Sequence, residues 1–196
     1  MDTTDPRFNG STLAIIDYGM GNLHSVASAV EHVAPDVDVC VSGDPNVISS
    51  ADRVIFPGVG AIRDCLGEIR RLKIDRVLEN LINDEKPILA ICVGMQALMN
   101  TSEENGGVKC LSILPGSGKH FGQDLRSREG VRLKVPHMGW NQVVQTQKHP
   151  LWEGIAQHSR FYFVHSYYVE TPHQTLEFGR CDYGHSFTAA MGKGNL

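Results

Sequence analysis

The chain has 196 residues, of which 41% are hydrophobic and 20% are charged, with a formal net charge of -4. This composition is typical of a globular protein and excludes a disordered or fibrous chain, while no apolar run is long enough to span a membrane. A negative net charge without a basic cluster argues against nucleic acid as a partner. The length predicts one domain over 12–196, preceded by a loose polar leader over 1–11.

The leader lacks the basic and apolar regions of a signal peptide, so we expect a cytoplasmic protein. The five cysteines are odd in number and widely spaced, which favours neither disulfides nor a zinc site. We therefore expect no metal and no cofactor.

Short apolar segments alternate with helical patterns through the first half of the chain. We expect strands at 12–17, 37–41, 53–56 and 88–91, and helices at 23–34, 61–84 and 93–99. This alternation predicts an α/β fold whose mostly parallel central sheet is flanked by helices, with the site at the carboxyl ends of the strands. After about residue 105, segments such as 132–135, 142–145 and 161–169 predict an added antiparallel portion.

The loop Pro57-Gly-Val-Gly60 follows the third expected strand. Gly58 and Gly60 have no side chains, so the backbone of this loop can come close to a ligand and supply an oxyanion-hole amide. A simple turn is the alternative interpretation.

Cys92 lies where the fourth strand joins a helix. Ala90-Ile-Cys92-Val-Gly94 is the cysteine counterpart of a nucleophile elbow, in which small residues two before and two after the nucleophile permit a strained turn. Backbone amides and the helix dipole at such a position are expected to lower the thiol pKa toward neutrality. A merely buried cysteine is the alternative, because free cysteine is often buried.

Two later segments, Pro136-His-Met-Gly-Trp-Asn141 and Phe161-Tyr-Phe-Val-His-Ser-Tyr-Tyr168, combine large aromatic residues with hydrogen-bonding groups. They suit a pocket, an interface or a core. Taken singly, His137 and His165 are interpreted as structural rather than catalytic. Strand alternation predicts that one face carries Tyr162, Val164 and Ser166 and that the other carries Phe161, Phe163, His165 and Tyr167.

Together these segments resemble the glutaminase subunit of imidazole glycerol phosphate synthase, a triad (class I) glutamine amidotransferase of histidine biosynthesis. The resemblance spans about residues 12–196 and rests on five elements: Asp17-Tyr-Gly-Met-Gly-Asn22, Pro57-Gly-Val-Gly60, Cys92-Val-Gly-Met-Gln96, Pro136-His-Met-Gly-Trp-Asn141 and Phe161-Tyr-Phe-Val-His-Ser-Tyr-Tyr168. It implies a flavodoxin-like sheet and a Cys92 that attacks the side-chain amide of glutamine, giving a thioester, ammonia and then glutamate.

The resemblance also assigns the helpers of Cys92. The amide of Val93 and one from the Pro57–Gly60 loop would hold the oxyanion, the latter after a peptide rearrangement. The substrate-binding elements would be Gly58, Val59, Gly60, Gln96, Ser166 and Tyr167. Asn22 and Tyr162 resemble residues at the junction with a cyclase subunit, a (β/α)8 barrel that would accept ammonia through a channel in a heterodimer.

The family carries its catalytic base in a His-Pro-Glu segment near its C-terminus, shortly after a Gly-Asn-Leu-like stretch. The printed chain ends at Gly194-Asn-Leu196, and none of its nine histidines stands in a His-Pro-Glu sequence. We therefore expect a domain truncated before its last strand and helix, and 196 residues that are nearly inactive alone.

Two other classes of protein stay open. One is a non-catalytic subunit that binds glutamine or the cyclase without hydrolysis, which the absent His-Pro-Glu segment favours. The other is a cysteine-dependent hydrolase or redox protein with a lone low-pKa thiol, which Gln96 and the aromatic segments disfavour.

Overall fold

The computed structural model describes residues 11–196, and their contacts divide into two compact units. The first unit holds residues 11–97 together with Gly194–Leu196, and the second holds Leu98–Lys193. Apart from residue 11, the expected leader lies outside the described residues. The expectation of one domain over 12–196 stays a prediction.

The first unit contains a parallel sheet of four strands in the order β2-β1-β3-β4. Its strands are β1 (Thr12–Ile16), β2 (Asp38–Ser42), β3 (Arg53–Phe56) and β4 (Ile88–Ala90). Each of the four predicted strands is confirmed to within one residue at either end. The carboxyl ends of β3 and β4 lead directly into the two segments predicted to carry the chemistry.

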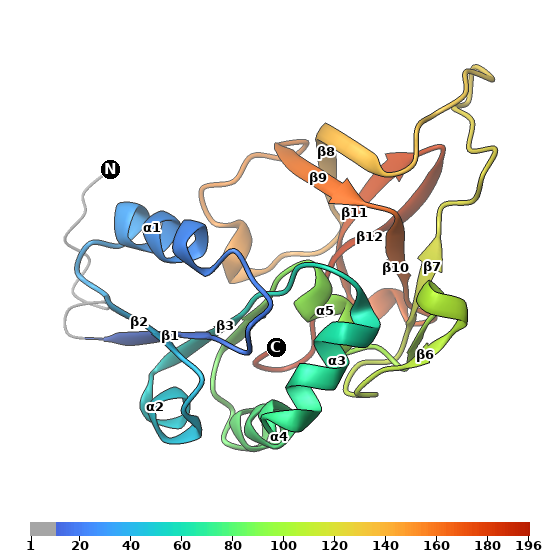
Figure 1. Ribbon diagram of the computed structural model, residues 1–196. Helices are drawn as coiled ribbons and strands as arrows, with labels where there is room; N and C mark the ends of the chain where they lie inside the picture. The colour runs from blue at the N-terminus through green and yellow to red at the C-terminus, as the bar shows by residue number, and fades with distance from the viewer. Residues whose placement is uncertain (1–10) are drawn as a thin grey trace. The chain divides into compact units, whose positions relative to one another are not determined.

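Helices cover both faces of this sheet. They are α1 (Leu23–Val33), α2 (Pro45–Ser50), α3 (Ile62–Arg71), α4 (Ile74–Asn83) and α5 (Val93–Ala97). Figure 1 shows α1 on one side of the sheet and α2, α3 and α4 on the other. The helix expected over 61–84 is two helices, because Lys73 between them takes a left-handed φ of 58°.

The spacing of apolar residues explains how α3 and α4 pack. Each buries a stripe at positions i, i+3, i+4 and i+7, namely Ile62, Cys65, Leu66 and Ile69 in α3, and Ile74, Val77, Leu78 and Leu81 in α4. Burying each of the larger side chains contributes about 1.5–3 kcal/mol. Cys65 of this stripe also donates its thiol hydrogen to the Val59 carbonyl, which ties α3 to the loop after β3.

The second unit contains an eight-stranded sheet in the order β6-β5-β7-β10-β12-β11-β8-β9. Its elements are β5 (Thr101–Ser102), η1 (Glu104–Gly106), β6 (Val108–Lys109), β7 (Ser117–His120), β8 (His137–Gln145), η2 (Pro150–Trp152), β9 (Arg160–His165), β10 (Tyr167–Glu170), η3 (Gln174–Leu176), β11 (Glu177–Tyr183) and β12 (His185–Met191). Most pairs are antiparallel, as predicted, and β5 with β7 is parallel.

Three predicted segments of this unit have different bounds in the structure. Segment 132–135 is not a strand, since only Arg132 forms an isolated bridge, to Arg126. Segment 142–145 is the end of β8, and segment 161–169 is divided at Ser166 into β9 and β10. Within residues 11–196, no helix has the length and apolar character needed to cross a membrane.

Candidate active site

Cys92 occupies a strained turn between β4 and α5. Its φ is 55°, a left-handed value that residues other than glycine rarely adopt, and the residue is exposed. This strain, where a strand meets a helix, is the geometry of a nucleophile elbow. The turn therefore supports the interpretation of Cys92 as a nucleophile over that of a buried cysteine.

Gly94 is required by the close approach of the elbow to β3. A Cβ built on Gly94 would lie well inside 3.0 Å of the Phe56 carbonyl oxygen, a separation that real Cβ atoms essentially never show. The Ile91 N–H also donates to the Phe56 carbonyl, at 2.9 Å. Only glycine two residues after Cys92 lets the elbow lie against β3.

The two predicted oxyanion elements meet one another directly. The Val93 N–H donates to the Gly58 carbonyl oxygen at 3.4 Å, so the amide beside Cys92 is engaged with the Pro57–Gly60 loop. Gly60 has a φ of 93°, which gives the loop its turn. In this arrangement the Val93 N–H is bonded to the Gly58 carbonyl and is not available to an oxyanion. The loop would have to rearrange before this N–H could bind one.

Two buried residues to which the sequence pattern assigned no role also contact this loop. The Tyr18 hydroxyl donates to the Pro57 carbonyl at 2.9 Å, and the Cys65 thiol donates to the Val59 carbonyl at 3.3 Å. Burial raises the pKa of Tyr18, and the nearby Cys65 and Cys92 raise it further. Tyr18 stands in the Asp17–Asn22 element of the resemblance, and Cys65 lies in the buried stripe of the helix that follows the loop, but neither had been given a role.

The predicted lowering of the Cys92 pKa is wrong in direction. Although the residue is exposed, the surrounding protein desolvates its thiolate and raises the thiol pKa above its ordinary value, while the Val93 N–H acts in the opposite sense. The helix dipole is small because α5 has five residues and ends at Ala97 rather than Met99. Activation of Cys92 therefore has to come from a base.

The predicted substrate-binding residues lie in both units. Gln96 is buried on α5, one turn after Cys92, whose carbonyl accepts its N–H at 3.1 Å. In the second unit, Ser166 forms the bend between β9 and β10, and Tyr167 is the first residue of β10. Phe121 N–H donates to the Ser166 carbonyl at 3.1 Å, and the Tyr167 ring meets His120 edge-on at 5.0 Å.

His137 and His165 form a hydrogen-bonded chain under this bend. His165 Nδ1 lies 2.9 Å from the Tyr167 carbonyl, which can only accept, so Nδ1 carries the proton. His165 Nε2 then accepts from His137 Nδ1 at 3.0 Å, and His137 Nε2 accepts from the Asn141 amide at 3.3 Å. Both rings are neutral with satisfied nitrogens, which supports their structural interpretation.

Burial keeps both imidazoles neutral. Desolvation, with a contribution from His165, lowers the pKa of His137 to about 4, and desolvation lowers that of His165 as well. His137 is 3% exposed and stacks between Phe163 and Tyr183, at centroid distances of 4.8 and 3.8 Å. The chain thus joins the two aromatic segments of the sequence.

The outer face of the β8–β9 pair is apolar and exposed. Trp140 pairs with Tyr162 and Met138 pairs with Val164, and these four side chains are 56–67% exposed. Phe161, Phe163 and His165 are half-buried on the other face, which confirms the predicted alternation as far as His165, and the bend at Ser166 ends it there. We call the four exposed residues the β8–β9 patch. Asn22, the other predicted interface residue, caps α1 by accepting from Ser25 N–H.

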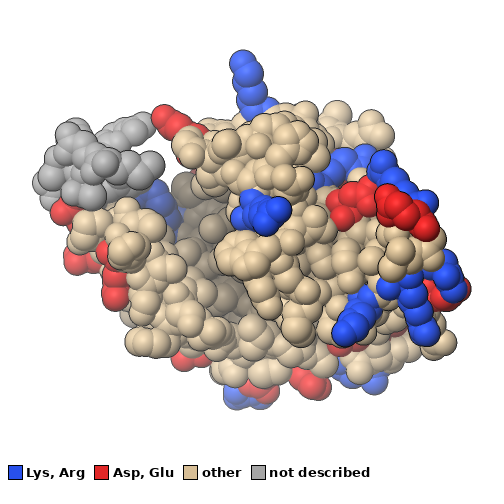
Figure 2. Space-filling view, turned by 90° about the horizontal axis from the view of Figure 1, so that it is seen from above, with Lys and Arg blue, Asp and Glu red and all other residues tan. Residues whose placement is uncertain are grey.

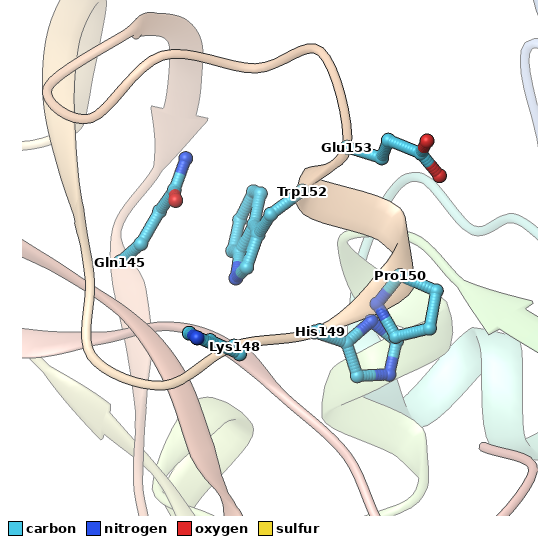
Figure 3. Close-up of a pocket in the computed structure, with 6 residues that line it drawn as sticks. All are labelled: Gln145, Lys148, His149, Pro150, Trp152 and Glu153. Carbon is cyan, nitrogen blue, oxygen red and sulfur yellow. The ribbon is translucent and has the colours of Figure 1, made fainter.

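A separate pocket of about 420 Å³ lies in the second unit, around η2. Figure 3 shows Trp152 between Gln145 on one side and His149 with Pro150 on the other. The Trp152 indole N–H donates to the Phe178 carbonyl and the Gln145 amide donates to that of Ile155, so these groups hold the loop itself. None of the predicted site residues lines it. Within residues 11–196, no group of three or more His, Cys, Asp or Glu residues could hold a metal ion.

Comparisons with known proteins agree with the geometry around Cys92. The family model described as glutamine amidotransferase class-I matches residues 14–195. The chain is 55% identical over 184 residues to the imidazole glycerol phosphate synthase subunit HisH of Pseudomonas syringae, covering 94% of this chain and 85% of that protein. The HisH 1 subunit of Pseudomonas aeruginosa matches with the same identity and coverage.

Solved structures share the fold at low sequence identity. A structure titled glutamine amidotransferase has a TM-score of 0.62 at 12% identity, covering 85% of this chain and 79% of its own. The PurLQS structure from Thermotoga maritima has a TM-score of 0.60 at 14% identity, covering 88% of this chain and 75% of its own. These likenesses confirm the predicted α/β fold class. With the family model and the relatives, they show that the chain belongs to the class I glutamine amidotransferases and, within them, to the HisH subunits of imidazole glycerol phosphate synthase.

Proposed function

We propose that this protein is the glutaminase subunit of imidazole glycerol phosphate synthase and supplies ammonia for histidine biosynthesis. The observation that carries the proposal is Cys92 on a strained elbow whose next amide, Val93 N–H, reaches the Gly58 carbonyl. A nucleophile, an oxyanion donor and a rearrangeable loop are thus gathered in one turn. Membership in the HisH family supports glutamine as the substrate.

In the proposed reaction, Cys92 gives up its proton to a base and its sulfur bonds to the amide carbon of glutamine. The base then returns this proton to the amide nitrogen, the C–N bond breaks and ammonia leaves. A γ-glutamyl thioester stays on Cys92. Water cleaves the thioester to glutamate and restores the thiol. Because the Cys92 pKa is raised, the base is essential, and the resemblance assigns it to a His-Pro-Glu segment.

Negative charge on the carbonyl oxygen needs two backbone donors. Turning the Gly58–Val59 peptide would withdraw the Gly58 carbonyl from Val93 N–H and bring Val59 N–H to the same side. Gly60 and Gln96 are proposed to bind the glutamine beside this turn. Ser166 and Tyr167 are kept as substrate-binding residues on the strength of the resemblance.

The proposed partner is a cyclase subunit with a (β/α)8 barrel, joined in a cytoplasmic heterodimer. The β8–β9 patch supports such an interface because exposed Trp and Tyr are typical anchors of protein contacts. Ammonia must reach the partner through a channel, since in neutral water it becomes mostly ammonium, which is not nucleophilic. Lyase chemistry then belongs to the cyclase. Figure 2 shows acidic and basic side chains interspersed on one face, a pattern unlike a nucleic-acid surface.

Glutamate release tests the proposal. We would assay the 196-residue chain and a version extended by a His-Pro-Glu segment, each with its cyclase partner and a nucleotide ligand, with Cys92→Ala as the control. Activity in the extended, partnered enzyme that Cys92→Ala abolishes is the expected result. No activity in either version, with both folded and associated, would overturn it in favour of a binding subunit.

A further inference from the structure

Buried side chains hold the Pro57–Gly60 loop on both sides of a single peptide. Tyr18, which is 1% exposed, donates its hydroxyl hydrogen to the Pro57 carbonyl. Cys65, which is 0% exposed, donates its thiol hydrogen to the Val59 carbonyl. Cys65 also contributes to the raised pKa of Tyr18, so the two side chains lie close together beneath the loop.

The held carbonyls belong to the first and third peptides of the loop. The peptide between them carries the Gly58 carbonyl and the Val59 N–H, and that carbonyl is the acceptor for Val93 N–H. Each peptide is a rigid plane, so rotating ψ of Gly58 and φ of Val59 together turns the central plane alone. Such a turn leaves both held carbonyls in place.

We propose that Tyr18 and Cys65 are positioning residues: by holding the carbonyls of Pro57 and Val59, they confine the rearrangement of the loop to the Gly58–Val59 peptide. The turned Val59 N–H then points at the oxyanion position rather than at one of several directions. This inference rests on the proposed glutaminase function and adds two residues to it.

The surroundings of Gly58 agree with this role. A Cβ at Gly58 would lie 2.5 Å from the Tyr18 hydroxyl oxygen and 2.8 Å from the Gly94 amide nitrogen. The hydroxyl therefore fills the space beside the peptide, on the side toward the elbow. Pro57 and Gly58 are buried, so solvent is a poor substitute for the Tyr18 donor.

The test measures glutamate release over a range of glutamine concentrations, which gives both kcat and KM, by the protein extended with a His-Pro-Glu segment and in complex with its cyclase partner and a nucleotide ligand. Tyr18→Phe and Cys65→Ala each remove one donor with little change of shape. We expect each to lower kcat about tenfold and to change KM for glutamine less than about twofold, because a misdirected oxyanion donor weakens the transition state rather than substrate binding. Cys65→Ser keeps a donor and should stay close to wild type.

Matched controls remove the same bonds elsewhere. Tyr183→Phe deletes a hydroxyl that donates to the Lys134 carbonyl at 2.8 Å, and Cys110→Ala deletes a thiol that donates to the Val108 carbonyl at 3.8 Å. Both should keep the wild-type kcat. Alkylation of Cys92 by iodoacetamide needs no oxyanion hole, so its rate should be the same in Tyr18→Phe as in wild type.

The inference would be overturned if folded Tyr18→Phe and Cys65→Ala both kept the wild-type kcat, or if they raised KM and left kcat unchanged. It would also be overturned if the rate of Cys92 alkylation in Tyr18→Phe fell by the same factor as kcat. If Tyr18→Phe does not fold, the difference between Cys65→Ala and Cys65→Ser decides. The proposed function fails separately, if the extended complex without substitutions releases no glutamate or if its Cys92→Ala variant is equally active.

Discussion

At Gly94, the absence of a side chain lets the elbow lie against the end of β3. Any side chain there would meet the Phe56 carbonyl, which is part of the backbone and cannot swing away. Gly94→Ala is expected to destabilise the protein by roughly 3 kcal/mol through this overlap and to abolish glutaminase activity. Urea unfolding measures the change in stability.

Gly67 provides the matched control for that substitution. It lies within α3, and a Cβ there would have no neighbour within 4 Å. Gly67→Ala should therefore stabilise the protein by up to about 1 kcal/mol, since alanine is the better helix former. Equal stability of Gly94→Ala and wild type would show that the elbow does not need glycine.

The thiol of Cys92 is the second feature at this scale. Desolvation raises the pKa of this thiol above its ordinary value, so in the 196-residue chain little thiolate exists at neutral pH. We expect the rate of alkylation of Cys92, measured by peptide mapping at a series of pH values, to go on rising with pH above pH 9. A rate that levels off near pH 7 would contradict this and restore a low-pKa thiol.

At the scale of elements, β8, β9 and the start of β10 are joined through the neutral His137–His165 chain. Protonating His137 would replace the acceptor that faces Asn141 with a donor and place a charge between Phe163 and Tyr183. Because His137 is hydrogen-bonded to His165, and His165 to the Tyr167 carbonyl, protonation at acid pH would disturb the hydrogen bonds that hold the segment of Ser166 and Tyr167.

The sign of the pH effect follows from the lowered pKa. Between about 6.5, the ordinary value, and about 4, the unfolded chain binds a proton that folded His137 does not. The free energy of unfolding should thus decrease as pH falls through this window, by at most about 3 kcal/mol from this group.

His137→Phe keeps a stacking ring and removes the titration. Urea unfolding of wild type and His137→Phe at pH 7 and pH 5 should show a smaller loss at pH 5 in the variant. The same loss in both proteins would mean that other groups carry the pH dependence.

Local pattern was enough to predict some elements but not others. Strands β1, β3 and β4 follow from short apolar runs ended by glycine or proline signals. Helix α2 was not predicted because its six residues bury only Ile48, and β11 and β12 were not assigned. The bend at Ser166 depends in part on the Phe121 N–H, which donates to the Ser166 carbonyl from 45 residues earlier in the chain.

The candidate site shows the same division. Cys92 and Gly94 could be predicted, because an elbow needs those residue types at that spacing. Tyr18 and Cys65 could not, because their role depends on carbonyls 39 and 6 residues away in the chain. The raised pKa of Cys92 was missed because desolvation and the length of α5 are properties of the folded structure.

For the whole molecule, the β8–β9 patch leads to a prediction about assembly. Trp140 is 67% exposed and meets Tyr162 edge-on at 5.6 Å, so the pair is available as an anchor. Trp140→Ala should weaken binding of the cyclase subunit about thirtyfold, which corresponds to about 2 kcal/mol. Titration calorimetry with the purified cyclase measures this affinity.

Leu151→Ala is the control for the patch. Leu151 is 60% exposed in the same unit but lies outside the β8–β9 pair, so its removal should leave the affinity unchanged. Equal affinities for Trp140→Ala and Leu151→Ala would place the cyclase elsewhere on the protein.

The most direct test of the central claim is to trap the thioester on Cys92. The active complex would be quenched with acid during turnover of glutamine, digested and analysed by mass spectrometry. We predict a γ-glutamyl group on the peptide that contains Cys92, and neither adduct nor glutamate release in Cys92→Ala. Glutamate release by Cys92→Ala at the wild-type rate would contradict nucleophilic catalysis by this cysteine.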